Sequence, residues 1–342
     1  MRRFILMAIM LSAALLCGQN WQTLNNTNHV YSMVKDGSDL YLSTWGGVLH
    51  VEGTLPSQMK EVKHWTTGDG LVSNDIRSLS WIDFSSSLWF GSGDDGISIV
   101  SPSGIQNLDI SLGLPSLRIN ETLGHGSRIL VATAQGLAMF YYLPGVSFPL
   151  MLNQYNTTTT GGALLHNNIT DIQLTDSGLL FLATDAGINY VQFDSLDVNS
   201  AWHSIPSGAS LPASSRYLIS TNAEKIAVAT DTQVYLNDLD LNPDSWENTN
   251  LHPGIEDIPI AALKLTSGGD LWVSYGAWDA TLLTYHNDSG LLLSRIAPTG
   301  DITSFNEDSQ GLGLSEIASI HEFDEAIYIC TWGDGIAVLL GQ

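Results

Sequence analysis

Basic side chains are scarce in this sequence, and three of its arginines recur at comparable places. The 342 residues contain 12 Lys and Arg against 35 Asp and Glu. Arg77, Arg118 and Arg216 each stand near the start of a short apolar segment that precedes a stronger one. A guanidinium can hold a carboxylate or a phosphate through two parallel hydrogen bonds, so these arginines are candidate ligands for an anionic group. The alternative is that nearby acids neutralise them as buried ion pairs. Those acids are Asp75, Glu121 and Glu316.

Tryptophan and aspartate recur in the turns that follow the strongest apolar segments. The residues concerned are Trp45, Asp94, Asp95, Trp278, Asp279, Trp332 and Asp334. An exposed tryptophan can stack on a sugar ring or anchor a protein partner, so we treat the whole set as candidate ligand-binding residues. The alternative is that these tryptophans cover the end of the fold as packing, because exposed aromatic groups also occur without a function.

The sequence contains no clear motif for a metal site or for a catalytic nucleophile. The acidic turns at 93–96 and 333–335 are too short for an EF-type calcium loop, and no histidine pair has the helical spacing of a zinc site. No serine lies in a nucleophile elbow, and no glycine-rich loop opens a helix. We therefore expect no metal and no cofactor. A structural calcium ion is the alternative, given the many carboxylates.

One five-residue pattern recurs seven times and predicts the elements that hold these residues. Each copy has bulky apolar residues, then a small residue, then usually a hydroxyl. The copies are Leu40–Thr44, Leu88–Ser92, Ile129–Thr133, Leu180–Thr184, Ile226–Thr230, Leu271–Tyr275 and Ile327–Thr331. A period of roughly 40 to 50 residues with four short strands per repeat is typical of a propeller blade. The predicted fold is therefore an all-β, seven-bladed β-propeller, with residues 19–342 as a single domain.

The fourth position of the pattern is small in every copy. Its occupants are Ser43, Gly91, Ala132, Ala183, Ala229, Ser274 and Cys330. Neighbouring sheets crowd together near the axis of a propeller, where a bulky side chain would collide with the next sheet. We therefore expect these residues to be buried, and Cys330 to be a structural thiol.

The order of strands along the chain predicts how the ring closes. The segment Gly335–Leu340 forms the third strand of the last blade and lacks a fourth. The orphan strand at Trp21–Asn25 can fill that place, which removes the exposed edges of an open stack.

Alternating strand directions place two kinds of connection on one face of the ring. The turns between the second and third strands of a blade emerge there, together with the links from each blade to the next. This loop-rich face is the expected binding surface, because binding residues concentrate on loops held by a rigid scaffold. Arg77 and Arg118 should occupy matching inner-strand positions near the mouth of the channel, with Arg216 near the equivalent place.

The second repeat resembles a known family. Gly70-Leu71-Val72-Ser73-Asn74 and Leu88-Trp89-Phe90-Gly91-Ser92 resemble the propeller repeat of bacterial two-component regulators, and 313–315 with 331–335 echo it. The chain is also similar to the propellers of the type IX secretion surface protein PorZ. The first resemblance implies a periplasmic sensor propeller, which in that family is joined to a membrane span and a kinase.

The first 18 residues are typical of a secretory signal peptide. Arg2 and Arg3 precede an apolar stretch at Phe4–Leu16, and Gly18 offers a small residue for cleavage. We expect a secreted, periplasmic or cell-surface protein without a membrane span, and a lipid anchor at Cys17 is the less favoured alternative. The net charge of −23 repels phosphate backbones, so we expect no nucleic-acid partner.

A complete set of structural repeats without a catalytic constellation favours a binding or scaffold module that recognises a protein or a glycan. One rival hypothesis is a propeller-type lyase or hydrolase acting on a polysaccharide or a small secreted compound at the channel mouth. Such an enzyme would need a histidine, for example His166 or His321, beside Arg77 and Arg118. Two further hypotheses are a sensor component of a two-component or secretion system, and an assembly unit that binds copies of itself.

Overall fold

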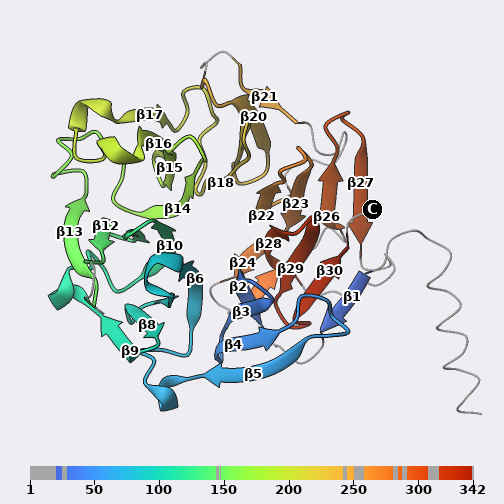
Figure 1. Ribbon diagram of the computed structural model, residues 1–342. Coiled ribbons are helices and arrows are strands. Elements are labelled where there is room, and N and C mark those ends of the chain that lie inside the picture. The colour runs from blue at the N-terminus through green and yellow to red at the C-terminus, as the bar shows by residue number, and fades with distance from the viewer. Residues whose placement is uncertain are drawn as a thin grey trace, which may run out of the picture.

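Seven four-stranded sheets form a closed ring around a central channel in the computed structural model (Figure 1). The structure describes residues 21–24, 29–143, 146, 148–241, 245–249, 258–279, 284–286, 291–306 and 316–340. Only the backbone is described for 21–24, 277–279, 284–286 and 291. The predicted seven-bladed propeller is confirmed. The predicted signal peptide and Cys17 lie outside the described residues.

The chain builds the blades in order, each from its innermost strand outward. The first four blades are β2 (Val30–Asp36), β3 (Asp39–Thr44), β4 (Gly47–Glu52), β5 (Lys60–Trp65); β6 (Ile76–Ile82), β7 (Ser87–Ser92), β8 (Ile97–Ser101), β9 (Gly104–Leu108); β10 (Ile119–His125), β11 (Arg128–Thr133), β12 (Gly136–Tyr141), β13 (Leu150–Tyr155); and β14 (Ile169–Leu174), β15 (Leu179–Thr184), β16 (Gly187–Gln192), β17 (His203–Pro206). The last three are β18 (Leu218–Thr221), β19 (Lys225–Ala229), β20 (Val234–Asp238), β21 (Glu247–Asn248); β22 (Ile260–Leu265), β23 (Leu271–Tyr275), β26 (Leu291–Ile296), β27 (Ile302–Asn306); and β28 (Ile317–Phe323), β29 (Ala326–Thr331), β30 (Ile336–Leu339), β1 (Trp21–Leu24).

The two ends of the chain close the ring by antiparallel pairing. Trp21 pairs with Leu339 and Leu24 pairs with Ile336, so β1 becomes the outermost strand of the seventh blade (Figure 1). The predicted closure is confirmed, and the outer edge of β30 is covered.

The small residues of the repeat lie where adjacent blades meet. The side chains of Ser43, Ala132, Ala183, Ala229, Ser274 and Cys330 are all inaccessible to solvent, as expected. A Cβ atom added at Gly91 would lie 2.4 Å from Ser78 Oγ and 2.5 Å from Ile119 Cγ2 of the next blade. Burial raises the pKa of the Cys330 thiol to about 12, so this side chain stays protonated and inert as packing.

The sixth blade departs from the others at the turn between its second and third strands. An additional hairpin, β24 (Ala277–Asp279) paired with β25 (Thr284–His286), is inserted there. Five of the other blades make this turn at a glycine, whereas the fifth blade turns at 230–233 without one. Gly47 has φ +117°, and a Cβ atom there would lie 2.1 Å from the Trp65 carbonyl oxygen. The fifth and sixth repeats both lack a glycine at the matching position, and its absence alone did not predict the hairpin.

Candidate functional site

The inner strands of six blades contain a β-bulge that directs one side chain toward the channel. In each strand the pairing shifts by one residue directly after the first pair. A bulge re-aims the side chain of its extra residue. The bulge residues are Tyr31, Arg77, Asn120, Thr170, Ala261 and Ala318. All six line the central cavity.

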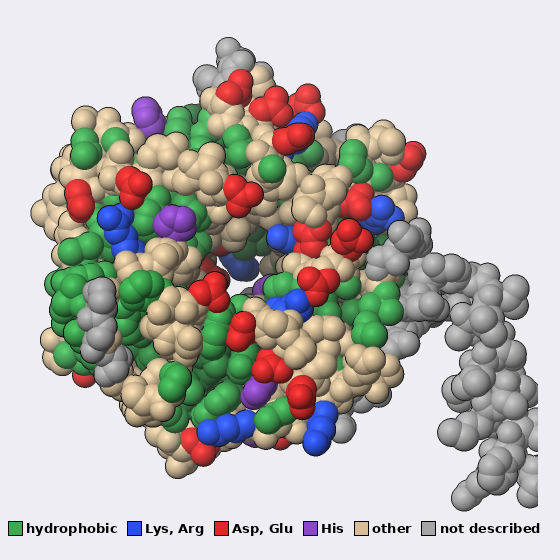
Figure 2. Space-filling model, in the orientation of Figure 1, with side chains coloured by type: hydrophobic (Ala, Val, Ile, Leu, Met, Phe, Trp, Pro, Cys, Tyr) green, Lys and Arg blue, Asp and Glu red, His purple; other side chains and the backbone are tan. Residues whose placement is uncertain are grey.

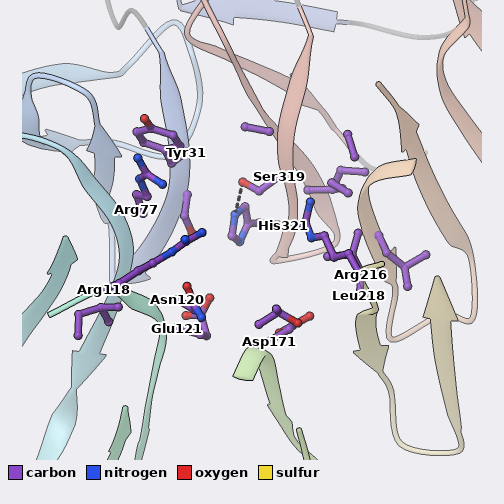
Figure 3. A pocket seen from close by; sticks show the side chains of 18 of the residues that line it. Tyr31, Arg77, Arg118, Asn120, Glu121, Asp171, Arg216, Leu218, Ser319 and His321 are labelled. Atoms are coloured by element: carbon purple, nitrogen blue, oxygen red, sulfur yellow. Dashed lines mark hydrogen bonds between the residues drawn. The ribbon is translucent and has the colours of Figure 1, made fainter. Parts of the chain in front are cut away.

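The cavity occupies the axis of the ring and is open at its mouth (Figure 2). Its volume is about 480 Å³, a size typical of small-molecule sites. Besides the bulge residues, its wall includes charged and titratable side chains from several blades. These are Arg118, Glu121, Asp171, Arg216 and His321 (Figure 3).

The three predicted arginines all line this cavity, but they have different environments. Arg77 Nη2 donates a hydrogen bond to Asp75 Oδ2 at 2.8 Å, and Nε donates to the same carboxylate. The guanidinium also lies over the Tyr31 ring, 5.9 Å from its centroid. Burial opposes the charged form of Arg77, but the hydrogen bonds to Asp75 and the charge of that carboxylate outweigh it and raise the arginine's pKa. The ion pair predicted as the alternative for Arg77 is therefore present.

Arg118 and Arg216 are exposed to the channel and form no ion pair with any acid of the described residues. No carboxyl oxygen of Glu121 lies within 4.0 Å of a guanidinium nitrogen of Arg118 or Arg216. Glu121 therefore forms no ion pair with either arginine. The expectation that Arg77 and Arg118 occupy matching positions was wrong. Arg77 is the bulge residue of β6, whereas Arg118 precedes β10, whose bulge residue is Asn120.

Two carboxyl groups lie beside these arginines in the wall of the channel (Figure 3). Burial raises the pKa of Glu121 to about 8, with the charge of the neighbouring Asp171 as a second cause. Burial likewise raises the pKa of Asp171, although hydrogen bonds from Ile219 N and Gln173 and the positive charge of Arg216 oppose that shift. Both side chains are half-buried in the wall of the cavity. Glu121 is therefore largely protonated at neutral pH.

His321 lies in the same cavity and is held by a neighbour on its own strand. Its Nε2 is 2.9 Å from Ser319 Oγ. Burial and the positive charge of Lys264 lower its pKa to about 3, so the imidazole is neutral under ordinary conditions. The other histidine considered at the sequence level, His166, does not line this cavity. It is exposed, 3.5 Å from Asp185, and its Nδ1 accepts a hydrogen bond from Asn168 N.

An aromatic cluster lies next to the channel, between the last blade and the first. Trp45 and Trp332 stack with ring centroids 5.5 Å apart. Trp332 also packs edge-on against His29 and Tyr31, with centroids 4.5 and 4.9 Å away. The expectation that Trp332 is exposed was wrong, because these rings cover it and leave only 4% accessible, whereas Trp45 is 41% exposed. Trp45 is thus an exposed platform backed by a buried ring, and Tyr31 connects the cluster to Arg77.

The other predicted residues are more dispersed. Asp94 and Asp95 are exposed in the turn after β7, and the charge of Asp94 reaches Arg77. Asp334 is half-buried in the turn after β29. Trp278 and Asp279 lie on β24, and their side chains are outside the part of the chain that is described.

Sequence reasoning missed several residues that line the channel. Among them are Tyr31, Asn120, Asn168 and Asp171. The bulges that orient the inner strands leave no obvious sequence signature. A polar residue directly after a buried Val or Ile at the start of an inner strand was the available signal, as in Val30-Tyr31 and Ile119-Asn120.

Among the described residues, no group of three or more His, Cys, Asp and Glu side chains is placed to hold a metal ion. The described part of the chain also contains no helix with the length and hydropathy needed to cross a bilayer.

Solved structures with the same architecture include propellers that are parts of much longer chains. The extracellular domain of the putative one-component system BT4673 from B. thetaiotaomicron matches with a TM-score of 0.67 and 16% identity. PorZ, a surface component of the type IX secretion system of Porphyromonas gingivalis, matches with a TM-score of 0.60 and 16% identity. Both matches cover 94% of this chain but only 39% of the other. The two share this propeller fold.

A virginiamycin B lyase from Staphylococcus aureus has the same fold at nearly the same length. The match has a TM-score of 0.63 and 15% identity, and it covers 94% of this chain and 99% of the lyase. No family model matches the chain, and no curated protein matches it. At these identities the comparisons establish the propeller fold and leave the activity to be argued from the site.

Proposed function

We propose that this propeller is an extracytoplasmic binding module that recognises a glycan or a protein through its loop-rich face. The observation that carries the proposal is the stacked pair of Trp45 and Trp332, which continues through Tyr31 into the channel. An exposed ring held rigid by a buried one loses little entropy when a ligand stacks on it. The two arginines and the apolar stretch that follows them within residues 1–18 are typical of a secretory signal peptide and support a location outside the cytoplasm.

A glycan is the better fit to this surface. The aromatic platform adjoins a cavity whose wall carries guanidinium, amide and carboxyl groups, so one ligand can stack and form hydrogen bonds at the same time. The cavity is too narrow for a folded domain and large enough for one or two sugar units. The matching part of BT4673 is the extracellular domain of a putative one-component system, and PorZ is a surface component of a secretion system, which supports a role in sensing or secretion.

A glycan array with the purified protein tests the proposal. Trp45→Ala should abolish or strongly reduce the signals, because it removes the exposed platform. Phe84→Ala is the matched control. Phe84 is 50% exposed on the connection between β6 and β7, which emerges on the opposite face. Loss of binding in the control, or full binding in Trp45→Ala, would reject the loop-rich face as the binding surface.

A lyase is the second candidate, because His321 shares its cavity with Arg77 and Arg118 and because a lyase has this fold. The environment of His321 disfavours it. A group whose pKa is about 3 is unprotonated at neutral pH, so it cannot act as an acid and is a weak base. The lyase hypothesis predicts turnover of a polysaccharide or a small secreted compound that His321→Ala abolishes.

A further inference from the structure

Three of the few basic residues converge on one small cavity. The whole sequence has 12 Lys and Arg and a net charge of −23, yet Arg77, Arg118 and Arg216 line the same lumen. Of these three, only Arg77 has a carboxylate partner among the described residues. Figure 3 shows Arg118 and Arg216 extending into the lumen from opposite walls. Two like charges that share a narrow cavity repel each other, and an anion between them removes that repulsion.

The other polar groups of the wall are largely engaged in holding the blades together. Asn120 Nδ2 donates to Asn168 Oδ1 at 3.1 Å and to the Ile169 carbonyl at 2.7 Å. Asn168 Nδ2 donates to Asp185, and Asp171 accepts from Ile219 N of the next blade at 3.0 Å. Within the described part of the chain, the guanidiniums of Arg118 and Arg216 make no such contact, so they are the groups available to a ligand.

The carboxyl group of Glu121 does not cancel these charges at neutral pH, because its pKa is raised to about 8, and Asp171 forms no ion pair with either arginine. Glu121 Oε1 accepts a hydrogen bond from Thr122 N at 3.1 Å, so the proton of the neutral acid resides on Oε2. A protonated Oε2 can donate to an anion. The titratable and charged groups that face this side chain across the lumen are Arg77, Arg118, Asp171, Arg216 and His321.

We propose that the channel is an anion site in which Arg118 and Arg216 hold one carboxylate, and that the glycan recognised is therefore an acidic one with an exposed uronate. The inference rests on the proposed function, because it names the chemical class of the ligand for the same face. One sugar carboxylate would enter the lumen while the adjoining ring stacks on Trp45. The cavity of about 480 Å³ accommodates such a terminal unit.

Calorimetric titration with an oligosaccharide that ends in glucuronate tests the proposal, and its glucose-terminated counterpart is the neutral control. We expect saturable binding of the acidic sugar and at least about tenfold weaker binding of the neutral one. Arg118→Gln and Arg216→Gln should each weaken the acidic sugar about tenfold or more. Arg128→Gln should leave affinity within about twofold, because Arg128 pairs with Asp194 and does not line the lumen.

The pH dependence gives an independent test. Affinity should fall by about fivefold or more between roughly pH 6.5 and pH 9.5, because Glu121 ionises in that range and repels a bound carboxylate. Glu121→Gln cannot ionise and should remove this dependence while keeping affinity at the lower pH. An unchanged pH profile in Glu121→Gln would overturn the role of this residue.

A protein carboxylate could present the same chemistry, and peptides distinguish that source. A peptide with a free C-terminus should bind no better than its amidated form if the ligand is a glycan. Stronger binding of the free peptide than of the glucuronate oligosaccharide would overturn the glycan assignment. Equal affinity for the acidic and the neutral sugar would overturn the anion site. If Trp45→Ala loses its array signals while the glucuronate titration is flat, the proposed function stands and the anion site falls.

Discussion

Two adjacent positions in each bulged inner strand behave in opposite ways. The first is Val30, Ile76, Ile119, Ile169, Ile260 or Ile317, always a β-branched aliphatic residue and always buried against another blade. The second, which is the bulge residue, is Tyr, Arg, Asn, Thr or Ala and faces the lumen. Packing constrains the first position in every blade, whereas the lumen accepts different chemistry from each blade.

The bulge is the device that separates the two roles. Without it, the second residue would pair across the sheet and point into the neighbouring blade. With it, the wall of the channel can change without disturbing the core. The comparison implies that substitutions on the packed side will change the free energy of unfolding, whereas substitutions on the lumen side will change ligand affinity.

The largest effect should follow truncation on the packed side. Ile119→Ala leaves a cavity beside β7 and should lower the free energy of unfolding by about 2–5 kcal/mol. Arg118→Gln, one residue earlier, should change it by less than about 0.5 kcal/mol. Urea denaturation of both variants measures the difference. Comparable losses in the two variants would show that the residues facing the lumen contribute to packing as much as the buried ones.

An intermediate effect should follow overpacking between blades. Gly91→Ala places a Cβ atom against Ser78 and Ile119 and should cost about 1–3 kcal/mol of unfolding free energy. Gly46→Ala is the control, because its nearest neighbour would be Thr44 Oγ1 at 3.7 Å and the residue is exposed. The same denaturation experiment applies, and a tolerant Gly91 would show that the blades are less tightly packed than the contacts indicate.

The repeat made the packed side predictable and left the lumen largely unpredicted. Seven small residues at one position, Gly91 among them, fix the number of blades because the crowding near the axis recurs in each. The ring closure followed from a missing strand. The sequence identified Arg77 and Arg118 as candidates because basic residues are rare. The predicted alignment of their two strands was wrong by two positions, because the residue equivalent to Arg77 is Asn120. A bulge depends on how two strands pair, and a single strand does not reveal it.

The aromatic cluster shows a second limit of the sequence. Trp45 and Trp332 follow the same strand position in the first and last blades, so their contact depends on closure of the ring. Closure was predicted, but the burial of Trp332 depends on the additional rings of His29 and Tyr31. Those residues carry no distinctive spacing.

The smallest effect should follow removal of the ion-pair partner of Arg77. Asp75→Asn removes the carboxylate that pairs with Arg77 and leaves all three arginines of the lumen without an ion pair. Because both partners are partly exposed, the free energy of unfolding should fall by less than about 1 kcal/mol. Affinity for the glucuronate oligosaccharide should rise about two- to fivefold, measured by calorimetry. A decrease in affinity would show that Arg77 needs Asp75 to be positioned.

Thermal unfolding of the Arg118→Gln, Arg216→Gln double variant, with and without the glucuronate oligosaccharide, tests the central claim most directly. A ligand that binds the folded state raises Tm by mass action. We expect the double variant to unfold within about 2 °C of the unsubstituted protein and to lose the ligand-induced increase in Tm. A large drop in Tm without ligand, or an increase with ligand that equals that of the unsubstituted protein, would contradict the assignment of the lumen to ligand binding.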